Sequence, residues 1–303
     1  MIEVGLVGPG RVGRTLAGLL PSESFALGPV LSSNLTSTRR AVRVMRRGFA
    51  AAGPEDFAAC PVILIAVPDA AIEVTALGLS ETEFSWKKKV VLHSSGIFDS
   101  SVLEPLARRG ASVASMHPLF VFQRQPISLA GVHFTVEGNV SAVNVARKMI
   151  RAFNGEFQVV GPQNKVHHSI ATTLVTDFFT GLIEAAVCQM VAGGFSRKRA
   201  LSAMNRLLEV SLEDYERSGR SSRPGPLLQG NAEAVRRHLE ALRADDPDLA
   251  GSYLHAAKRT LAFLQRDPSG FSFLDSEHPP DPRDATDPGT SSGPQPSPNR
   301  RTS

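Results

Sequence analysis

The first twenty residues constrain the fold most, because they follow the order of a strand, a glycine turn and a helix. The apolar run IEVGLV is followed by Gly8, Gly10 and Gly13 in a GxGxxG pattern, and then by apolar residues at helical spacing. In this context the first glycine permits a tight turn, the second lets the backbone approach a pyrophosphate, and the third allows close packing of helix on strand. The start of the helix offers amide donors to phosphates. The pattern predicts dinucleotide binding rather than a glycine turn without a ligand.

Short apolar runs recur through the first half of the chain. FALGPVLSS, VILIAVPD, KKVVLHSSG and ASVASMHPL are each predicted to be a strand, and their continuous apolar character is typical of strands covered on both faces. Strands that alternate with helices predict an α/β fold, a Rossmann-type doubly wound and mostly parallel sheet. GVHFTVEG and EFQVVG are expected to add strands, with an antiparallel extension as one arrangement.

The chain is predicted to have three parts. Residues 1–161 form a Rossmann-like NAD(P)-binding domain, and residues 162–274 form an all-α C-terminal domain for substrate binding and dimerisation, because only helical periodicity is found there. Residues 275–303 are rich in proline and almost without apolar side chains, so they are expected to be a disordered tail.

Charge and cysteine content exclude several functional classes. The net charge is only +4, and the basic residues lie in short clusters without interleaved aromatic residues, so we expect no nucleic-acid partner and mostly solvated basic side chains. Cys60 and Cys188 are too few for a disulfide framework or a zinc cluster. No uninterrupted apolar stretch is long enough for a bilayer, and the N-terminus lacks a signal-peptide pattern. We therefore expect no structural metal, no membrane span and a cytoplasmic location.

The end of the second predicted strand indicates the cofactor. It finishes at Ser32, Ser33 and Asn34, with Arg39 close behind and no acid that would grip the ribose 2′-hydroxyl of NAD. Hydroxyl, amide and guanidinium groups can bind a 2′-phosphate, which favours NADP, although NAD is possible and the arginine also suits a solvated helix surface.

A third predicted strand ends at Val67 and Pro68, which are expected to line the cofactor site, and Asp69 is expected to cap the following helix rather than to act in catalysis. The predicted cofactor-binding residues are Gly8, Pro9, Gly10, Arg11, Val12, Gly13, Ser32, Ser33, Asn34, Arg39, Val67 and Pro68.

Candidate proton-transfer groups lie at the ends of later strands. His93 and His117 each follow an apolar strand, and each can be a general acid or a structural histidine. Lys165 lies at the predicted domain junction, where it would face these strand ends. His167 and His168 have no acidic partner at metal-ligand spacing, so no metal site is predicted.

Four segments carry a resemblance to a known family. VGLVGPGRVGRTLA, ILIAVPDAAI, VVLHSSGIFDSSVLEPLARRGASVASMHPLFVF and GPLLQGNAEAVRRHLEAL resemble uncharacterised oxidoreductases that join a Rossmann-like domain to the helical domain of unknown function 2520. The chain is more distantly similar to pyrroline-5-carboxylate reductase, 3-hydroxyisobutyrate dehydrogenase and 6-phosphogluconate dehydrogenase. The resemblance implies that Lys165 is the general acid or base and that Ser95 and Gly96 contact the substrate. His117, at its strand end, is expected to assist Lys165, and Asp177 is a further expected substrate contact.

The chain also departs from the family pattern. The family usually has a Tyr-His pair three residues after the lysine and an asparagine further along that helix, where this chain has His168-Ser169 and Asp177. Gln229 and Asn231 stand where Arg and Asp are typical of an Arg-Gly-Asp stretch. These differences are the basis of the second, inactive alternative given below.

We therefore expect an NADP-dependent oxidoreductase that transfers a hydride to or from a small carbonyl, hydroxy or imine compound. The alternative is a catalytically inactive NADP-binding sensor or interaction protein. A deazaflavin-dependent NADP reductase is a third reading, which the large helical domain disfavours. The helix ATTLVTDFFTGLIEAAVCQMV is apolar nearly all round, so we expect a homodimer by analogy with the dehydrogenases.

Overall fold

The chain forms two compact units in a computed structural model, Met1–Phe179 and Thr180–Ser303. The structure describes residues 1–123 and 128–275, so the predicted tail lies outside the described residues except for Asp275. The two units divide within one continuous helix, whereas the predicted boundary after residue 161 lies just beyond the last strand. That predicted boundary stays a prediction.

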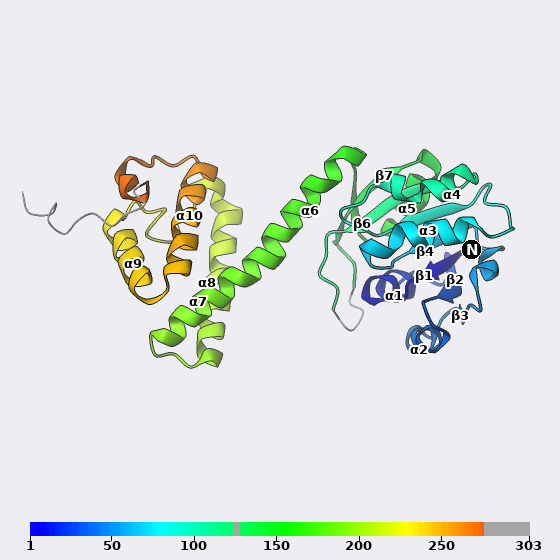
Figure 1. Cartoon of the computed structure of the whole chain (residues 1–303), viewed down its shortest axis with the longest axis horizontal. Coiled ribbons are helices and arrows are strands. Elements are labelled where there is room, and N and C mark those ends of the chain that lie inside the picture. The colour runs from blue at the N-terminus through cyan, green and yellow to red at the C-terminus, as the bar shows by residue number, and fades with distance from the viewer. Residues whose placement is uncertain (124–127, 276–303) are drawn as a thin grey trace, which may run out of the picture. The chain divides into compact units, whose positions relative to one another are not determined.

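The first unit is built on one eight-stranded sheet in the order β3-β2-β1-β4-β5-β6-β7-β8 (Figure 1). Neighbouring strands are parallel except β6 and β7, which are antiparallel, so β7 and β8 form the expected reversed extension. The strands are β1 (Ile2–Val7), β2 (Phe25–Leu31), β3 (Phe49–Ala50), β4 (Val62–Ile65), β5 (Val90–His93), β6 (Ser112–Pro118), β7 (His133–Gly138) and β8 (Glu156–Val159).

Helices cover both faces of this sheet. Alternate residues of β4 enter different cores: Leu64 packs in the cluster that includes α1 and α5, whereas Ile63 and Ile65 pack in the cluster that includes α3 and α4. This arrangement confirms the doubly wound α/β fold. The helices of the unit are α1 (Arg11–Gly18), α2 (Leu35–Met45), α3 (Ile72–Ser80), α4 (Glu104–Arg108), α5 (Val140–Ala152) and α6 (Lys165–Thr173), with short 3₁₀ turns at Pro54–Phe57, Asp69–Ala71, Ser100–Leu103 and Pro162–Asn164.

One basic residue is buried rather than solvated. The Lys89 ammonium donates hydrogen bonds to the carbonyl oxygens of Phe57 (3.1 Å), Ala58 (2.7 Å) and Cys60 (2.7 Å), and burial lowers its pKa. The bonds satisfy carbonyl groups at the end of a 3₁₀ turn. The expectation of a solvated side chain is wrong for Lys89, because the turn that precedes β4 places three acceptors around it.

Helices are the only regular secondary structure among the described residues of the second unit. Its core consists of Val235, Leu239, Ala257, Leu261, Phe271 and Leu274, which join its last two helices and the final 3₁₀ segment. The predicted absence of strands in this region is confirmed for the part of it that the structure describes. The elements are α7 (Phe179–Ala192), α8 (Arg197–Ser218), α9 (Ala232–Asp245) and α10 (Pro247–Phe263), with 3₁₀ segments at Gly219–Ser221 and Ser269–Leu274.

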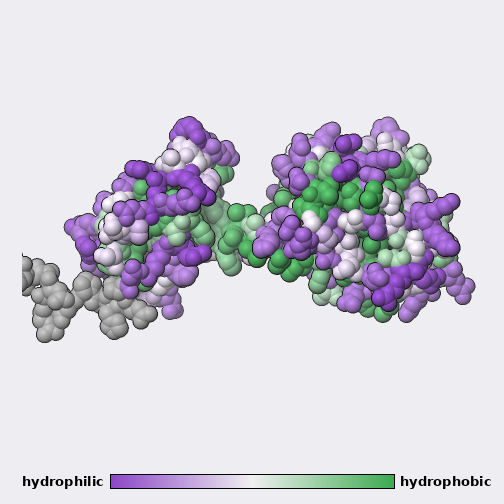
Figure 2. All heavy atoms as spheres, turned by 90° about the horizontal axis from the view of Figure 1, so that it is seen from above, coloured by the Kyte–Doolittle hydropathy of each residue, from purple (hydrophilic) through white to green (hydrophobic). Residues whose placement is uncertain are grey.

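A long apolar helix, Pro162–Ala192, is exposed along most of its length. It is long and apolar enough to cross a membrane by length and composition alone, and only 6% of its most apolar window is buried. Asp177 and Glu184 interrupt its apolar run, so the sequence has no uninterrupted apolar stretch of spanning length here. Figure 2 shows apolar side chains gathered along this helix. The exposed ones include Val166, Ile170, Leu174, Val175, Phe178 and Leu182.

Candidate functional site

The glycine turn after β1 has the geometry that its sequence predicts. Gly8 has a φ of +89°, which a side chain would strain, and its N–H donates to the Leu31 carbonyl oxygen of β2 at 2.9 Å. A Cβ atom on Gly13 would lie 2.3 Å from the Gly8 oxygen, so only glycine lets α1 start this close to the turn. Gly10 is different, because a Cβ atom there meets nothing within 4 Å. The turn therefore requires glycine at its first and third positions, whereas the second position has room for a side-chain atom or a ligand.

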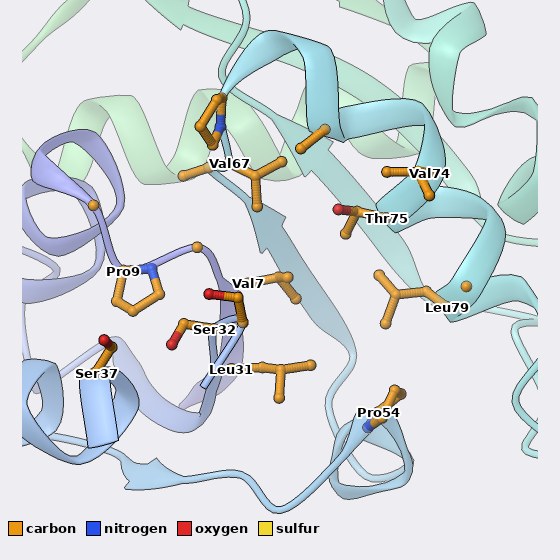
Figure 3. Close-up of a pocket in the computed structure, with 17 residues that line it drawn as sticks. Val7, Pro9, Leu31, Ser32, Ser37, Pro54, Val67, Val74, Thr75 and Leu79 are labelled. Atoms are coloured by element: carbon orange, nitrogen blue, oxygen red, sulfur yellow. The ribbon is translucent and has the colours of Figure 1, made fainter. Parts of the chain in front are cut away.

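A cavity of about 550 Å³ lies at this turn, between the carboxyl ends of the first parallel strands and α3 (Figure 3). Seven predicted cofactor-binding residues line it: Gly8, Pro9, Gly10, Ser32, Ser33, Val67 and Pro68. Arg11, Val12, Gly13, Asn34 and Arg39 do not. The other lining residues are Val7, Leu31, Ser37, Pro54, Ala66, Ala71, Val74, Thr75, Gly78 and Leu79. None of the described residues in this lining has an acidic or basic side chain.

The end of β2 is an ordered turn of hydroxyl and amide groups. The Ser32 hydroxyl donates to the Asn34 carbonyl oxygen at 2.9 Å, and the Asn34 side-chain oxygen accepts from the Ser37 N–H at 2.8 Å. Asn34 is therefore the N-cap of α2, which explains why it does not face the cavity. Ser33 and Ser37 do line the cavity, so hydroxyl groups stand where an acid would select NAD.

Asp69 does not cap a helix, contrary to the sequence expectation. It begins a short 3₁₀ turn whose N-cap, Pro68, makes no side-chain capping bond. Its negative charge instead raises the pKa values of Lys165 and His117, although burial outweighs this and lowers both. Asp69 is therefore near enough to a polar cluster at the ends of β5 and β6 for its charge to act on Lys165 and His117.

Lys165 is the centre of that polar cluster. Its side chain is 1% exposed, and its ammonium donates to the Ser95 carbonyl oxygen at 2.9 Å and to the Ser115 hydroxyl. Burial lowers its pKa to about 8, and nearby carboxylates, Glu137 above all, oppose that shift. Lys165 lines neither this cavity nor the one described below.

Ser95 and Gly96 are not among the lining residues of either cavity. The Ser95 hydroxyl accepts hydrogen bonds from the Ile97 N–H (3.2 Å) and the Phe98 N–H (3.1 Å), and the residue is 4% exposed. A Cβ atom on Gly96 would lie 2.8 Å from the imidazole of His117. In this structure Gly96 lets the His117 ring approach, and the predicted substrate contacts of both residues stay a prediction.

His93 has the environment of a structural histidine. It is completely buried, and burial lowers its pKa to about 3, so its ring is neutral at pH 7. Its Nδ1 atom accepts from the Ser95 N–H at 3.2 Å, which places the remaining proton on Nε2. Of the two roles left open by the sequence, the structure favours the structural one.

A second cavity, of about 850 Å³, lies between the end of β6 and the helix that begins with α6. Its polar lining includes His117 and Asp177, both predicted site residues, and His168, which the sequence had suggested only as an unsuitable metal ligand. Asp177 lies in a π-helical segment, Leu174–Phe178. Such segments are rare inside α-helices and occur frequently at functional sites. The full lining is His117, Pro118, Leu119, Phe120, Val121, His168, Ala171, Thr172, Val175, Thr176 and Asp177.

Sequence reasoning missed two buried polar residues of the cluster. Ser115 on β6 accepts from Lys165, and the Glu137 carboxylate on β7 accepts from the Ser100 N–H (2.8 Å) and hydroxyl (2.7 Å). Burial raises the pKa of Glu137. The available signal was the presence of polar residues inside apolar strands, since Thr135 and Glu137 alternate on one face of β7.

The departures from the family pattern in the second unit have local structural roles. Asn231 caps α9 by accepting from the Ala234 N–H at 3.0 Å, and the Gln229 amide donates to the Arg223 carbonyl oxygen at 3.2 Å. Within residues 1–123 and 128–275, no group of three or more His, Cys, Asp or Glu residues is placed to hold a metal ion.

Two regions of the chain match known domain families. Residues 1–118 match a Rossmann-like domain, and residues 132–260 match a domain of unknown function, DUF2520. The chain thus combines a Rossmann-like domain with DUF2520, as its motifs predicted. No curated protein sequence matches it.

Solved structures share this fold at low sequence identity. A provisionally described NADP oxidoreductase from Bacteroides fragilis has a TM-score of 0.69 and 15% identity, over 86% of this chain and 97% of that one. A reductive aminase from Aspergillus terreus, in complex with NADPH, has a TM-score of 0.59 and 15% identity, over 90% and 91%. A 1-pyrroline-5-carboxylate reductase from Streptococcus pyogenes has a TM-score of 0.58 and 15% identity, over 87% and 98%. At this identity the likeness establishes the fold alone.

Proposed function

We propose that the chain is an NADP-dependent oxidoreductase that acts on a small carbonyl, hydroxy or imine compound. The observation that carries the proposal is the cavity of about 550 Å³ at the glycine turn, lined without any acid at the end of β2. The similar structures, among them proteins described with NADP or NADPH, support it. The second cavity, with His117 and Asp177, is the proposed substrate site.

The residues at the first cavity fit a dinucleotide phosphate. The open space at Gly10 leaves room for a pyrophosphate, and the first amides of α1 have no helical partners of their own. The hydroxyls of Ser33 and Ser37 would bind a 2′-phosphate, with Arg39 on the neighbouring turn of α2. When bound, the nicotinamide supplies or accepts a hydride.

In this proposal His117 is the group that holds or releases a proton at the substrate, because it lines the second cavity. The predicted role of Lys165 as a direct donor requires its ammonium to reach that cavity. Its hydrogen bonds to Ser95 and Ser115 instead favour an indirect role. Its positive charge helps to lower the pKa of His117, after burial as the main cause, and so keeps that imidazole neutral.

Cofactor titrations test the proposal. We expect NADPH to bind more tightly than NADH when the fluorescence of each cofactor is followed during titration with the full chain. Ser33→Asp places a carboxylate where the 2′-phosphate would lie, so NADPH affinity should fall roughly tenfold or more while NADH affinity does not fall. Ser80→Asp, a change on α3 outside the cavity lining, is the control. If neither cofactor binds at millimolar concentration, the proposed function is wrong.

The departures at Ser169, Asp177, Gln229 and Asn231 keep the inactive NADP-binding sensor as the second candidate. Its distinguishing result is NADPH binding without turnover of any aldehyde, 2-oxo acid or cyclic imine.

We also propose a homodimer, supported by the exposed apolar side chains of Pro162–Ala192. Phe178 is 61% exposed on this helix, so Phe178→Glu should shift the protein from dimer to monomer in light scattering at tens of micromolar. Val140→Glu, at an apolar site on α5 that is 79% exposed, should leave the dimer intact. A monomeric wild-type protein, or its flotation with liposomes, would contradict the proposal that this helix pairs with a second copy and meets no membrane.

A cytoplasmic location without a nucleic-acid partner belongs to the same proposal. It is supported by two cysteines that are both free, Cys60 and Cys188, and by the weak net charge.

A further inference from the structure

The hydrogen-bonding role of His117 in the second cavity is fixed by its backbone contact. Its Nδ1 atom lies 3.1 Å from the carbonyl oxygen of Ser94, which can only accept. Nδ1 therefore carries the proton, and Nε2 of the neutral ring presents a lone pair. The close approach of Gly96 to the ring helps to hold this orientation.

The Thr172 hydroxyl also presents lone pairs. It donates to the Ser169 carbonyl oxygen at 2.9 Å, and because a hydroxyl has one proton, that proton is already committed to a backbone oxygen. The Thr176 hydroxyl uses its proton within the helix, on the Thr172 carbonyl oxygen (2.8 Å) or on the Asp177 carboxylate (3.2 Å). The Asp177 carboxylate has a second oxygen that can accept from a ligand. His117, Thr172 and Asp177 thus share one hydrogen-bonding character, that of an acceptor.

The rest of the lining sets the shape and charge of a ligand. Leu119, Val121 and Val175 supply an apolar wall, and no lysine or arginine is among the described residues that line the cavity. The Lys165 ammonium is bonded elsewhere, to Ser95 and Ser115. His168 adds an Nδ1 atom that is buried with no hydrogen-bond partner in the described residues, and it can serve either role. Among the described residues of the lining, the fixed charge is therefore the negative charge of Asp177.

We propose that this cavity binds a small ligand with an apolar body and a hydrogen-bond-donating head, either a protonated amine or a hydroxyl, held by His117 Nε2 and the Asp177 carboxylate. A ketone or carboxylate head offers only acceptors, so it would leave these groups unpaired or repel them. The inference rests on the proposed function only in taking this cavity as its substrate site, and binding itself needs no cofactor.

The charges around His117 give the binding a pH dependence. Burial lowers its pKa most, the Ser94 carbonyl opposes the shift, Lys165 and His168 lower the pKa further, and Asp69 raises it. The ring is therefore neutral at pH 7 and above. Hydroxyl binding should stay constant there and weaken in acid, once a proton occupies Nε2.

Four probes with the same ring test the proposal: cyclohexylamine, cyclohexanol, cyclohexanone and cyclohexanecarboxylate. Each is titrated into the full chain without any nicotinamide cofactor, and the imidazole NMR signals of His117 and His168 are followed. We expect saturable shifts with the amine and the alcohol, with affinities at least about tenfold higher than those of the ketone and the carboxylate. Equal or tighter binding of the ketone or carboxylate would overturn the proposal, whatever the outcome of the cofactor titrations.

Variants of Asp177 and His117 then show which probe each of these two acceptors binds. Asp177→Asn should weaken cyclohexylamine about tenfold and leave cyclohexanol within twofold, because only the amine carries a charge. His117→Phe, which keeps a ring against Gly96, should weaken both probes, and His117→Gln should restore part of the binding. His255→Phe, at an exposed histidine on α10, is the control. The ¹⁵N shifts of unliganded His117 provide an independent check, since a proton on Nε2 at pH 7.5 would contradict the assigned tautomer.

Discussion

Gly10→Asp should reduce NADPH affinity by a factor of about 100 or more while leaving the fold intact. A Cβ atom on Gly10 meets nothing within 4 Å, so we expect the substitution to cost little in packing. It places a carboxylate at the position where the turn and the first amides of α1 would receive a pyrophosphate, and two like charges at contact distance repel strongly. Fluorescence titration with NADPH measures the affinity, and thermal unfolding checks the fold.

Two alanine substitutions distinguish the effect of an added charge from the steric effect of an added side chain at the same turn. Gly10→Ala should keep NADPH affinity within a few fold, because it adds one methyl group in open space. Gly13→Ala should destabilise the protein, because its Cβ atom would lie 2.3 Å from the Gly8 oxygen and α1 would have to shift. Unchanged NADPH affinity in Gly10→Asp would mean that the phosphates do not bind at this turn.

Lys165→Met should remove a rise in stability that the wild-type protein shows between pH 7 and pH 9.5. The folded-state pKa of Lys165, about 8, lies below its ordinary value of 10.5. The unfolded chain therefore binds more protons between these values, and the free energy of unfolding rises with pH as the buried ammonium loses its charge. These two pKa values correspond to a gain of about 2 kcal/mol between pH 7 and pH 9.5. Urea denaturation at both pH values measures it.

Lys148→Met, at an exposed lysine on α5, is the matched control and should keep the wild-type pH profile. In Lys165→Met the pKa of His117 should also rise, because a positive charge that lowers it has been removed, and an NMR titration of the His117 imidazole follows this. A stability profile identical to that of the wild type would show that Lys165 is not buried as an ammonium.

The parts of this structure that the sequence predicts are those encoded by local patterns. GxGxxG between a strand and a helix predicts the turn at Gly8, and the absence of an acid after Ser33 is visible as the acid-free lining of the first cavity. Asn34 was predicted to bind cofactor, yet it caps α2, because an asparagine before a helix suits both roles and only the backbone geometry distinguishes them.

The polar cluster was less predictable because its partners come from distant strands. Lys165 meets Ser115 across fifty residues, and Glu137 meets Ser100 across thirty-seven. No spacing rule relates such positions, since the strand order and the reversed direction of β7 bring them together. The side of the helix on which Asp177 lies could not be predicted from its spacing either. Helical periodicity assumes a uniform α-helix, and the π-helical turn changes the angle between successive residues.

The π-helical segment also bears on how chains of this kind should be aligned. A single π turn within an α-helix holds one residue more than the α-helix around it needs. Leu174–Phe178 is therefore a natural place for a one-residue gap when this chain is aligned with relatives whose helix is regular. Because the π turn accommodates the extra residue within itself, the residues of α7 keep the faces that they would have in a regular helix one residue shorter, so such a gap would bring both α6 and α7 into register with a regular relative.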